Sequence, residues 1–446
     1  MYIIGVDEID ALLSFIYIIL ILLIGNVLKS RIKHSKVRTY FMPFLYFKIA
    51  CAIAFVLLHA YVYKGGDTYL YFAGGKIISS QILEEPERFF ELLFSGQETF
   101  LRINYSPGVM NIVGAFSDSS TLAMSQLSAP FILLGFQKFL ASTLLMSMVS
   151  FLGVWSLFKT LCSLYPRGTK LFALGVLFYP SIGIWGSGIL KDTITLACIG
   201  WAFSFIYKII QQKRLRTSIF VIAFSVFLCF KLKPYILYTF LPSMLLWSQG
   251  LISKNLKSSL VRYLATPVII LAFSLGGYFF LQGISSNTSK YSISNIQEVA
   301  EGFNSWHTFL AENRNQSGYS LGEIEFTPLG VLQKAPEAFF VTFYRPSLFE
   351  IRNFATAFES FQSTLLLLLT VYLIFKVGLI NLFKQIFFNN NVRAFLVFAI
   401  LLGIAVGLTS FNFGALSRYK IPCLPFYTAA LTIIYFEGMK LRGNLR

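Results

Sequence analysis

The sequence predicts an all-α fold, a polytopic transmembrane helical bundle of about 11 spans. Composition is the first observation behind this prediction, because 56% of the 446 residues are hydrophobic and only 13% are charged. Soluble globular chains carry about 25% charged residues. The second observation is that the apolar residues form long runs, which match the roughly 30 Å hydrocarbon core of a bilayer at a helical rise of about 1.5 Å per residue.

The apolar runs give the positions of the predicted spans. The first run follows Asp7, Glu8 and Asp10 rather than basic residues, so we interpret it as a retained span and not as a cleavable signal peptide. The spans are expected near residues 11–28, 43–63, 131–158, 171–189, 193–210, 217–232, 235–250, 264–282, 361–380, 394–411 and 421–437.

The distribution of charge between the loops is the third observation. The net charge is +17, but the basic residues lie in short loops between apolar runs, which the positive-inside rule explains better than nucleic-acid binding does. The basic cluster at 29–38 makes the first loop cytoplasmic, so the N-terminus is expected outside and the C-terminus inside. Of the 20 acidic residues, only Glu437 then falls on the cytoplasmic side.

Two long extracytoplasmic segments remain, at about 64–130 and 283–360. The first contains residues 68–83 and 86–94, which resemble short amphipathic helices that lie on the membrane, and an apolar stretch at 107–116 that can dip into it. The second contains two helix-like stretches, at 296–313 and 329–343. Because the sequence shows no internal repeat and no linker, residues 1–446 are expected to form a single membrane domain.

Unusual charged residues gather at the span ends of the outer face. Basic residues are expected inside, so those at the outer ends of spans depart from the trend of the other charges. For any one of them, snorkelling or ion pairing is as good an explanation as function. A shared anionic ligand, a lipid phosphate or pyrophosphate, explains the set. The candidate phosphate-binding residues are Lys191, Asp192, Lys231, Lys233, Arg345, Glu350 and Arg418.

Asp67 has a different character. Gly65 and Gly66 precede it, so the backbone can turn sharply and bring the carboxylate close to a substrate. A carboxylate in such a place serves as a general base or as a metal ligand. The alternative is a turn aspartate that hydrogen-bonds its own backbone, and for Asp67 alone this is the more common situation. Three His and five Cys without paired spacing predict neither a typical metal site nor a disulfide framework.

Five short motifs resemble bacterial multi-span glycosyltransferases of the GT-C type and the related surface-polysaccharide polymerases. They are an Asp in the first long outer segment, Pro180 to Asp192, Lys233-Pro234, Arg345 to Glu350, and Arg418 to Pro425. The resemblance implies a bacterial inner membrane protein that uses a polyprenyl-phosphate-linked sugar donor on the extracytoplasmic side, with a glycan or lipid acceptor. In typical members the catalytic loop follows the first span, whereas here it follows the second.

By this resemblance Asp67 is the catalytic base and the basic residues hold the lipid phosphate. No cofactor is expected, because no second Asp adjoins Asp67 to form a paired-carboxylate metal motif. A repeat-unit polymerase is the alternative, in which Arg345 and Arg418 matter more than Asp67. A lipid or sugar transporter is less favoured, since transporters typically show inverted repeats and mid-membrane sites. A non-catalytic scaffold does not explain basic residues on the outer face.

Overall fold

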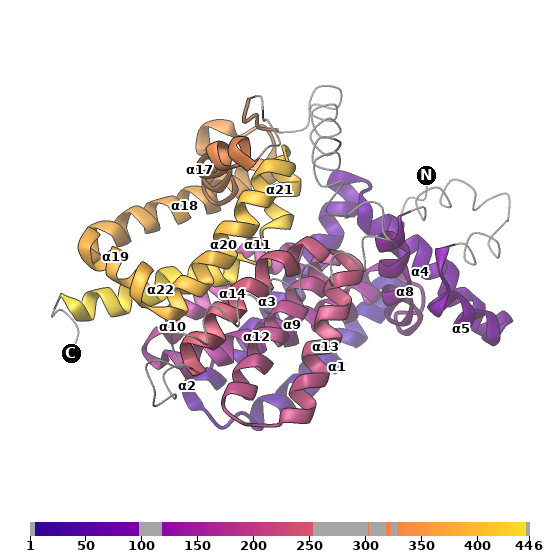
Figure 1. Cartoon of the computed structure of the whole chain (residues 1–446). Coiled ribbons are helices and arrows are strands. Elements are labelled where there is room, and N and C mark those ends of the chain that lie inside the picture. Colours follow the sequence, from indigo (N-terminus) through magenta and orange to yellow (C-terminus); the bar gives the residue numbers. More distant parts are fainter. Residues whose placement is uncertain are drawn as a thin grey trace. The chain divides into compact units, whose positions relative to one another are not determined.

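The computed structural model describes residues 5–97, 118–252, 302, 318–322, 324 and 328–442. Within these residues the chain is helical apart from its turns, loops and one isolated β-bridge between Gly318 and Asn412, so the predicted all-α class is confirmed (Figure 1). The predictions for 107–116, 264–282 and 296–313 lie outside the described residues.

The chain divides into two compact units. Unit 1 comprises 1–169, 177–205 and 216–233, and unit 2 comprises 170–176, 206–215 and 234–446. The helices of unit 1 are α1 (Glu8–Ser30), α2 (Ser35–Arg38), α3 (Phe41–Leu57) with a π-helical continuation (Leu58–Tyr63), α4 (Asp67–Glu84), α5 (Pro86–Phe94), α8 (Ser119–Leu134), α9 (Phe139–Leu164), a 3-10 turn (Pro166–Gly168), α11 (Pro180–Trp185), most of α12 (Lys191–Ile210) and α13 (Leu215–Leu232).

Unit 2 contains the remaining helices. They are α10 (Thr169–Phe172) with a π-helical turn (Ala173–Leu177), α14 (Pro234–Ile252), α17 (Pro328–Tyr344), a 3-10 turn (Leu348–Glu350), α18 (Phe354–Val377), α19 (Leu379–Phe388), α20 (Asn390–Thr409), α21 (Phe413–Tyr419) and α22 (Leu424–Leu441). Both units contain helices that are long and apolar enough to span a bilayer.

By length and composition the described residues hold seven candidate spans, which makes the chain a multi-pass membrane protein. These are Glu8–Ser30, Ser35–Tyr63, Phe139–Leu164, Lys191–Ile210, Leu215–Leu232, Ala355–Val377 and Asn390–Thr409. An eighth is formed if α21 and α22, which meet at a bend of 68°, count as one broken span. Each of these eight corresponds to a span that the sequence predicts.

Three predicted spans differ from the structure, and two of these differences have local causes. The third span begins at Phe139 rather than at 131. Residue 131 belongs to α8, which ends at Leu134, and Phe136 and Gln137, both with positive φ, separate α8 from α9. The stretch 171–189 is broken into α10, a π-helical turn and α11, since Pro180 starts a new helix. The stretch 235–250 is helical as α14, but it is not among the candidate spans. The stretches 68–83, 86–94 and 329–343 are helical, as the sequence predicts, and correspond to α4, α5 and α17.

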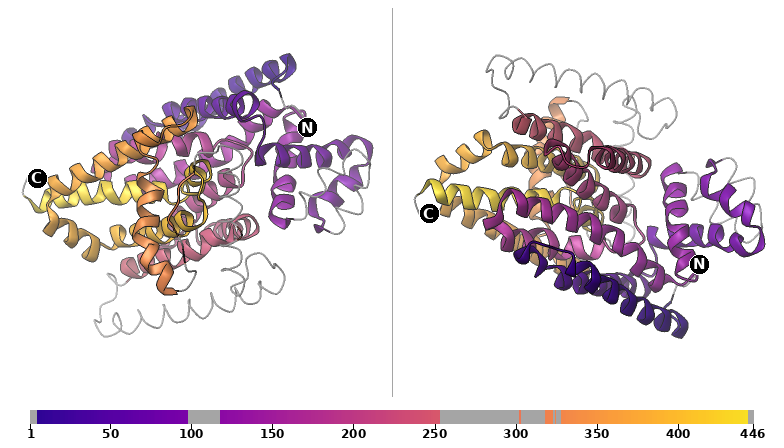
Figure 2. Two further views of the ribbon diagram at one scale, coloured as in Figure 1. Left: turned by 90° about the horizontal axis from the view of Figure 1, so that it is seen from above. Right: turned by 90° about the horizontal axis from the view of Figure 1, so that it is seen from below.

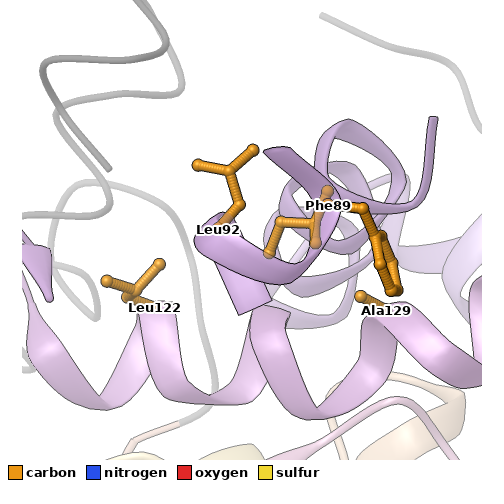
Figure 3. Close-up of a cluster of buried hydrophobic side chains, with 5 residues drawn as sticks. Phe89, Leu92, Leu122 and Ala129 are labelled. Carbon is orange, nitrogen blue, oxygen red and sulfur yellow. The ribbon is translucent and has the colours of Figure 1, made fainter. Parts of the chain in front are cut away.

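Within unit 1, Asp10 joins α1 to α9 by hydrogen bonds. Most of the apolar side chains of α1 are exposed. The buried Asp10 carboxylate accepts the backbone N–H groups of Leu140 at 2.9 Å and Ala141 at 3.0 Å. These are free donors of the first turn of α9, so Asp10 caps a helix other than its own. The neighbouring helices α4, α5 and α8 share a separate apolar cluster in which Phe89 and Leu92 lie against Leu122 and Ala129 (Figure 3).

Within unit 2, α22 packs against both α18 and α20, and these helices lie in the orange to yellow part of Figure 2. Close approach depends on small residues, since a Cβ at Gly407 would lie 2.3 Å from the carbonyl oxygen of Ala338 in α17. Thr342 Oγ1 donates to the carbonyl oxygen of Gly403 at 2.7 Å, which also joins α17 to α20. The small residues therefore let α17 pack directly on the backbone of α20.

Candidate functional site

Asp67, the predicted catalytic base, is the first residue of α4 and its side chain is exposed. Gly66 precedes it with φ +105°, a conformation that residues with a side chain rarely adopt, so the predicted sharp turn depends on this glycine. Behind the turn, Gly66 lies against the buried His59, and the Tyr69 hydroxyl donates to the His59 carbonyl oxygen at 2.9 Å. The turn therefore holds Asp67 at the surface of unit 1.

Lys191 begins α12 and its ammonium group is bound by several oxygens. Nζ lies 2.6 Å from the Ser120 hydroxyl and 3.3 Å from Oδ2 of Asp118. Asp118 also caps α8, because its side chain accepts the Thr121 backbone N–H at 3.1 Å. The Lys191 ammonium lies 5.4 Å from the centre of the Tyr71 ring, a cation–π contact. Lys191 thus joins the start of α12 to α8 and α4.

Asp192 and Lys233 form a second and more deeply buried pair. Nζ of Lys233 lies 2.5 Å from Oδ1 of Asp192, and the two side chains are 8% and 0% exposed. Asp192 lies in the first turn of α12, where a negative charge interacts favourably with the helix dipole, and Lys233 lies between the end of α13 and the start of α14. Lys231, in the last turn of α13, is exposed. Lys231 and Lys233, which were both predicted to bind phosphate, therefore lie in different environments: Lys231 is exposed and Lys233 is buried.

We call Asp118, Lys191, Asp192 and Lys233 the lysine cluster. It joins the starts of α8 and α12 to the end of α13. Two carboxylates balance two ammonium groups, so the cluster by itself presents no net positive charge to an anion. Asp67 lies near it, because Asp67 is one helical turn before Tyr71, the residue under the Lys191 ammonium.

Lys48 also belongs to this part of unit 1, although it was not a predicted site residue. It is buried within α3, and its Nζ donates to the carbonyl oxygen of Gly186 at 2.8 Å. The Ser150 hydroxyl donates to the same oxygen. Both groups therefore fix the turn that follows α11 and leads into Lys191. The signal in the sequence is a lysine in the middle of an apolar run, which is costly unless it is paired or functional.

Arg345 and Glu350 form an ion pair in unit 2. Nε of Arg345 lies 3.0 Å from Oε1 of Glu350, and the Arg345 Nη2 group donates to the same carboxylate. Burial alone raises the pKa of Glu350, but hydrogen bonds from Arg345 and Ser347 outweigh it, so this pKa lies below its ordinary value. The Arg345 guanidinium also lies 5.9 Å from the Tyr319 ring centre and 5.7 Å from that of Phe413. We call these five residues the arginine cluster.

Arg418 lies on α21, the short helix whose first residue, Phe413, contacts Arg345. Two residues later, the buried Lys420 donates through Nζ to the carbonyl oxygen of Thr342 at 3.0 Å. The buried Glu359 of α18 interacts electrostatically with Lys420. Lys420 and Glu359 were not predicted as site residues, although Lys420 lies inside the Arg418 to Pro425 motif.

The predicted site residues therefore gather in two groups. Lys191, Asp192 and Lys233 meet in the lysine cluster of unit 1, and Asp67 lies one helical turn before Tyr71, which contacts Lys191. Arg345 and Glu350 meet in the arginine cluster of unit 2, and Arg418 lies on a helix that contributes to it. Among the described residues, no group of three or more His, Cys, Asp or Glu side chains is arranged to hold a metal ion.

Comparisons with known proteins give no match: no family model fits the chain, and searches of curated proteins and of solved structures find no significant similarity.

Proposed function

We propose that this chain is a membrane glycosyltransferase that uses a polyprenyl-phosphate-linked sugar donor. The observation that carries the proposal is the placement of Asp67, an exposed carboxylate one helical turn before Tyr71, whose ring contacts the Lys191 ammonium of the lysine cluster. An exposed carboxylate can be approached by an acceptor hydroxyl, and the nearby charges are held in fixed positions by hydrogen bonds. Positioned groups of this kind lower the barrier to transfer because they need little reorganisation during the reaction.

In the proposed reaction, Asp67 accepts the proton of the acceptor hydroxyl. The hydroxyl oxygen forms a bond with the anomeric carbon of the donor sugar, and the bond from that carbon to the phosphate oxygen breaks. The phosphate leaves with the electron pair as an anion. Because Lys191 and Lys233 are each paired with a carboxylate, we assign them to positioning α12. The exposed Lys231 is the cation of unit 1 that we assign to the phosphate.

The proposal includes a topology of about eleven spans in a bacterial inner membrane, with Asp67 on the extracytoplasmic side and the C-terminus inside. All five cysteines are buried, so cysteines introduced at exposed positions can be labelled selectively. An impermeant maleimide added to intact cells should label a cysteine at Ser119 and spare one at Gln212. The reverse pattern would invert the assignment of faces.

The test of the proposed reaction is sugar transfer from a radiolabelled polyprenyl-linked donor in liposomes. Asp67→Asn should keep donor binding and lose activity by a factor on the order of 10², as removal of a general base does. Glu87→Gln, an exposed acidic residue of the neighbouring α5, is the matched control and should keep full activity. Full activity in Asp67→Asn would remove the base role.

A repeat-unit polymerase is the second candidate, and the arginine cluster favours it. The Arg345 guanidinium is partly buried beside two aromatic rings, an arrangement suited to an anionic glycan or to a lipid phosphate. If Arg345→Ala and Arg418→Ala abolish transfer, Asp67→Asn does not, and the product is a long chain, the polymerase replaces the transferase.

A further inference from the structure

The helix α19 connects two candidate spans but is too short to be one itself. Its ten residues, Leu379–Phe388, extend about 15 Å, roughly half the thickness of the hydrocarbon core. Gly378, with φ +79°, separates it from α18, and Asn389 separates it from α20. Figure 1 shows α19 at the connection of these two helices, and it also packs against α22. This position is expected at a membrane surface, where the chain leaves one span and enters the next.

The two faces of α19 are reversed relative to a helix of a water-soluble protein. Gln385 is buried and its side-chain oxygen accepts from the Asn389 amide at 3.0 Å, so this polar side chain is turned toward the protein. The apolar face is turned outward. Its members have exposed fractions from 54% to 85% and are Leu379, Ile380, Phe383, Phe387 and Phe388.

Helix α5 is a useful contrast, because it is about as long and also amphipathic. It buries Phe89 and Leu92 against α8 and exposes Glu87 and Glu91 (Figure 3). A helix that buries its apolar side and exposes carboxylates is suited to water. A helix that exposes its apolar side and buries an amide is suited to hydrocarbon, since the hydrophobic effect would otherwise oppose this orientation.

Positive charge surrounds the apolar face of α19. Lys384 lies on the helix, Lys376 precedes it in the last turn of α18, and Arg393 follows it in α20; all three are exposed. The guanidinium of Arg442, at the end of α22, lies against Gly378. Between Ser360 and Phe436 the sequence has no acidic residue. An apolar face bordered by Lys and Arg is complementary to a leaflet that contains anionic lipids.

We propose that α19 is a membrane-surface helix that inserts its apolar face among acyl chains and binds anionic phospholipid headgroups through Lys376, Lys384 and Arg393. This inference does not depend on the proposed enzymatic activity. The occupant of the apolar face is then a phospholipid leaflet, and not water or a second copy of the chain.

The first experiment measures what covers the apolar face. Spin labels are attached to Ile380→Cys and Phe387→Cys in the full chain, reconstituted in vesicles of equal parts phosphatidylglycerol and phosphatidylcholine. The five native cysteines are buried, so labelling is selective. Collisions with oxygen should exceed those with a water-soluble nickel chelate, and the reverse should hold for Gln212→Cys, the exposed control. Collisions of the Phe387→Cys label with the nickel chelate would show that the apolar face is in water. A low collision rate with both oxygen and the nickel chelate would show that another copy of the protein covers the face. Either result overturns the proposal.

The second experiment tests the headgroup. The rise in thermal unfolding midpoint on adding phosphatidylglycerol, relative to phosphatidylcholine, is measured in detergent. Combined replacement of Lys376, Lys384 and Arg393 by Gln should reduce this rise several-fold. The matched control replaces Arg31, Lys33 and Lys36 by Gln, which removes the same charge from exposed positions near α2, and it should keep most of the rise. Equal losses in both variants would show a general charge effect and would remove the assignment to α19.

Discussion

The lysine cluster of unit 1 and the arginine cluster of unit 2 contain the same kinds of charge in different settings. In the first, the Lys233 and Asp192 side chains are 8% and 0% exposed. In the second, the Arg345 and Glu350 side chains are 28% and 24% exposed. A deeply buried pair is held in place because neither charge is tolerated there alone. A partly exposed pair loses less solvation, so the comparison predicts that removal of one charge costs more stability in the buried pair than in the partly exposed one.

Removal of Lys233 should have the largest effect on stability. Lys233→Met leaves the Asp192 carboxylate buried without its ammonium partner, which costs about 3–5 kcal/mol for a buried pair. The free energy of unfolding, measured by denaturant titration in mixed micelles, should fall by this amount. Lys231→Met, two residues away and exposed, is the control and should change it little. An equal loss of unfolding free energy in Lys233→Met and Lys231→Met would show that the buried pair stabilises the fold no more than an exposed lysine does.

A second variant tests the cause of that loss. Asp192→Asn combined with Lys233→Met removes both charges from the same buried site. The double variant should recover part of the stability that Lys233→Met loses, because no unpaired charge remains. A double variant that is no more stable than Lys233→Met would show that packing of the lysine stem, and not the charge, is what matters.

Loss of Lys191 should have an intermediate effect. Lys191→Met removes the ammonium from Asp118, whose side chain is 26% exposed and keeps hydrogen bonds from Ser120 and Thr121. The remaining partners limit the cost to about 1–3 kcal/mol, the range for one lost hydrogen bond to a charged group. The same titration measures it. A loss as large as that of Lys233→Met would contradict the ranking by burial.

Much of the fold follows from the sequence, because long apolar runs have few alternatives to helices in a membrane. The exact start of the span at Phe139 and the break before Pro180 did not follow, since they depend on local backbone conformation within apolar sequence. The site was predicted only in part. Lys191 and Asp192 were identified, but their partners Asp118 and Lys233 are 73 and 41 residues away, and sequence spacing does not show which distant groups meet.

The buried lysines show a second limit of prediction from the sequence. Lys48 was visible as a charge in an apolar run, but its acceptor is the backbone carbonyl of Gly186, and every residue has such a group. The same holds for Lys420 and the carbonyl of Thr342. A sequence shows which side chains need a partner, whereas the packing decides which backbone oxygen provides it.

The partly exposed pair should show a modest pH dependence. The pKa of Glu350 is lowered in the folded protein, so its contribution to stability is present above the ordinary carboxyl pKa and is lost as the pH falls through the folded value. Because the pair is about one quarter exposed, the loss should be at most about 1 kcal/mol. Unfolding midpoints are compared between neutral and acidic pH for the native chain and Glu350→Gln. An equal acid effect in both would exclude Glu350 as its source.

Lys138 and Asp7 form a pair whose carboxylate is more exposed than that of Glu350, and its loss should have the smallest effect. Nζ of Lys138 lies 2.5 Å from Oδ2 of Asp7, and the Asp7 side chain is 57% exposed. Asp7 also caps α1 by accepting the Asp10 backbone N–H at 2.7 Å. Asn caps helices about as well as Asp, so Asp7→Asn removes the charge while it keeps the cap. The unfolding midpoint should not change measurably, at low or at high salt. A clear loss at low salt that disappears at high salt would show that even an exposed ion pair stabilises this chain, and burial would no longer rank the pairs.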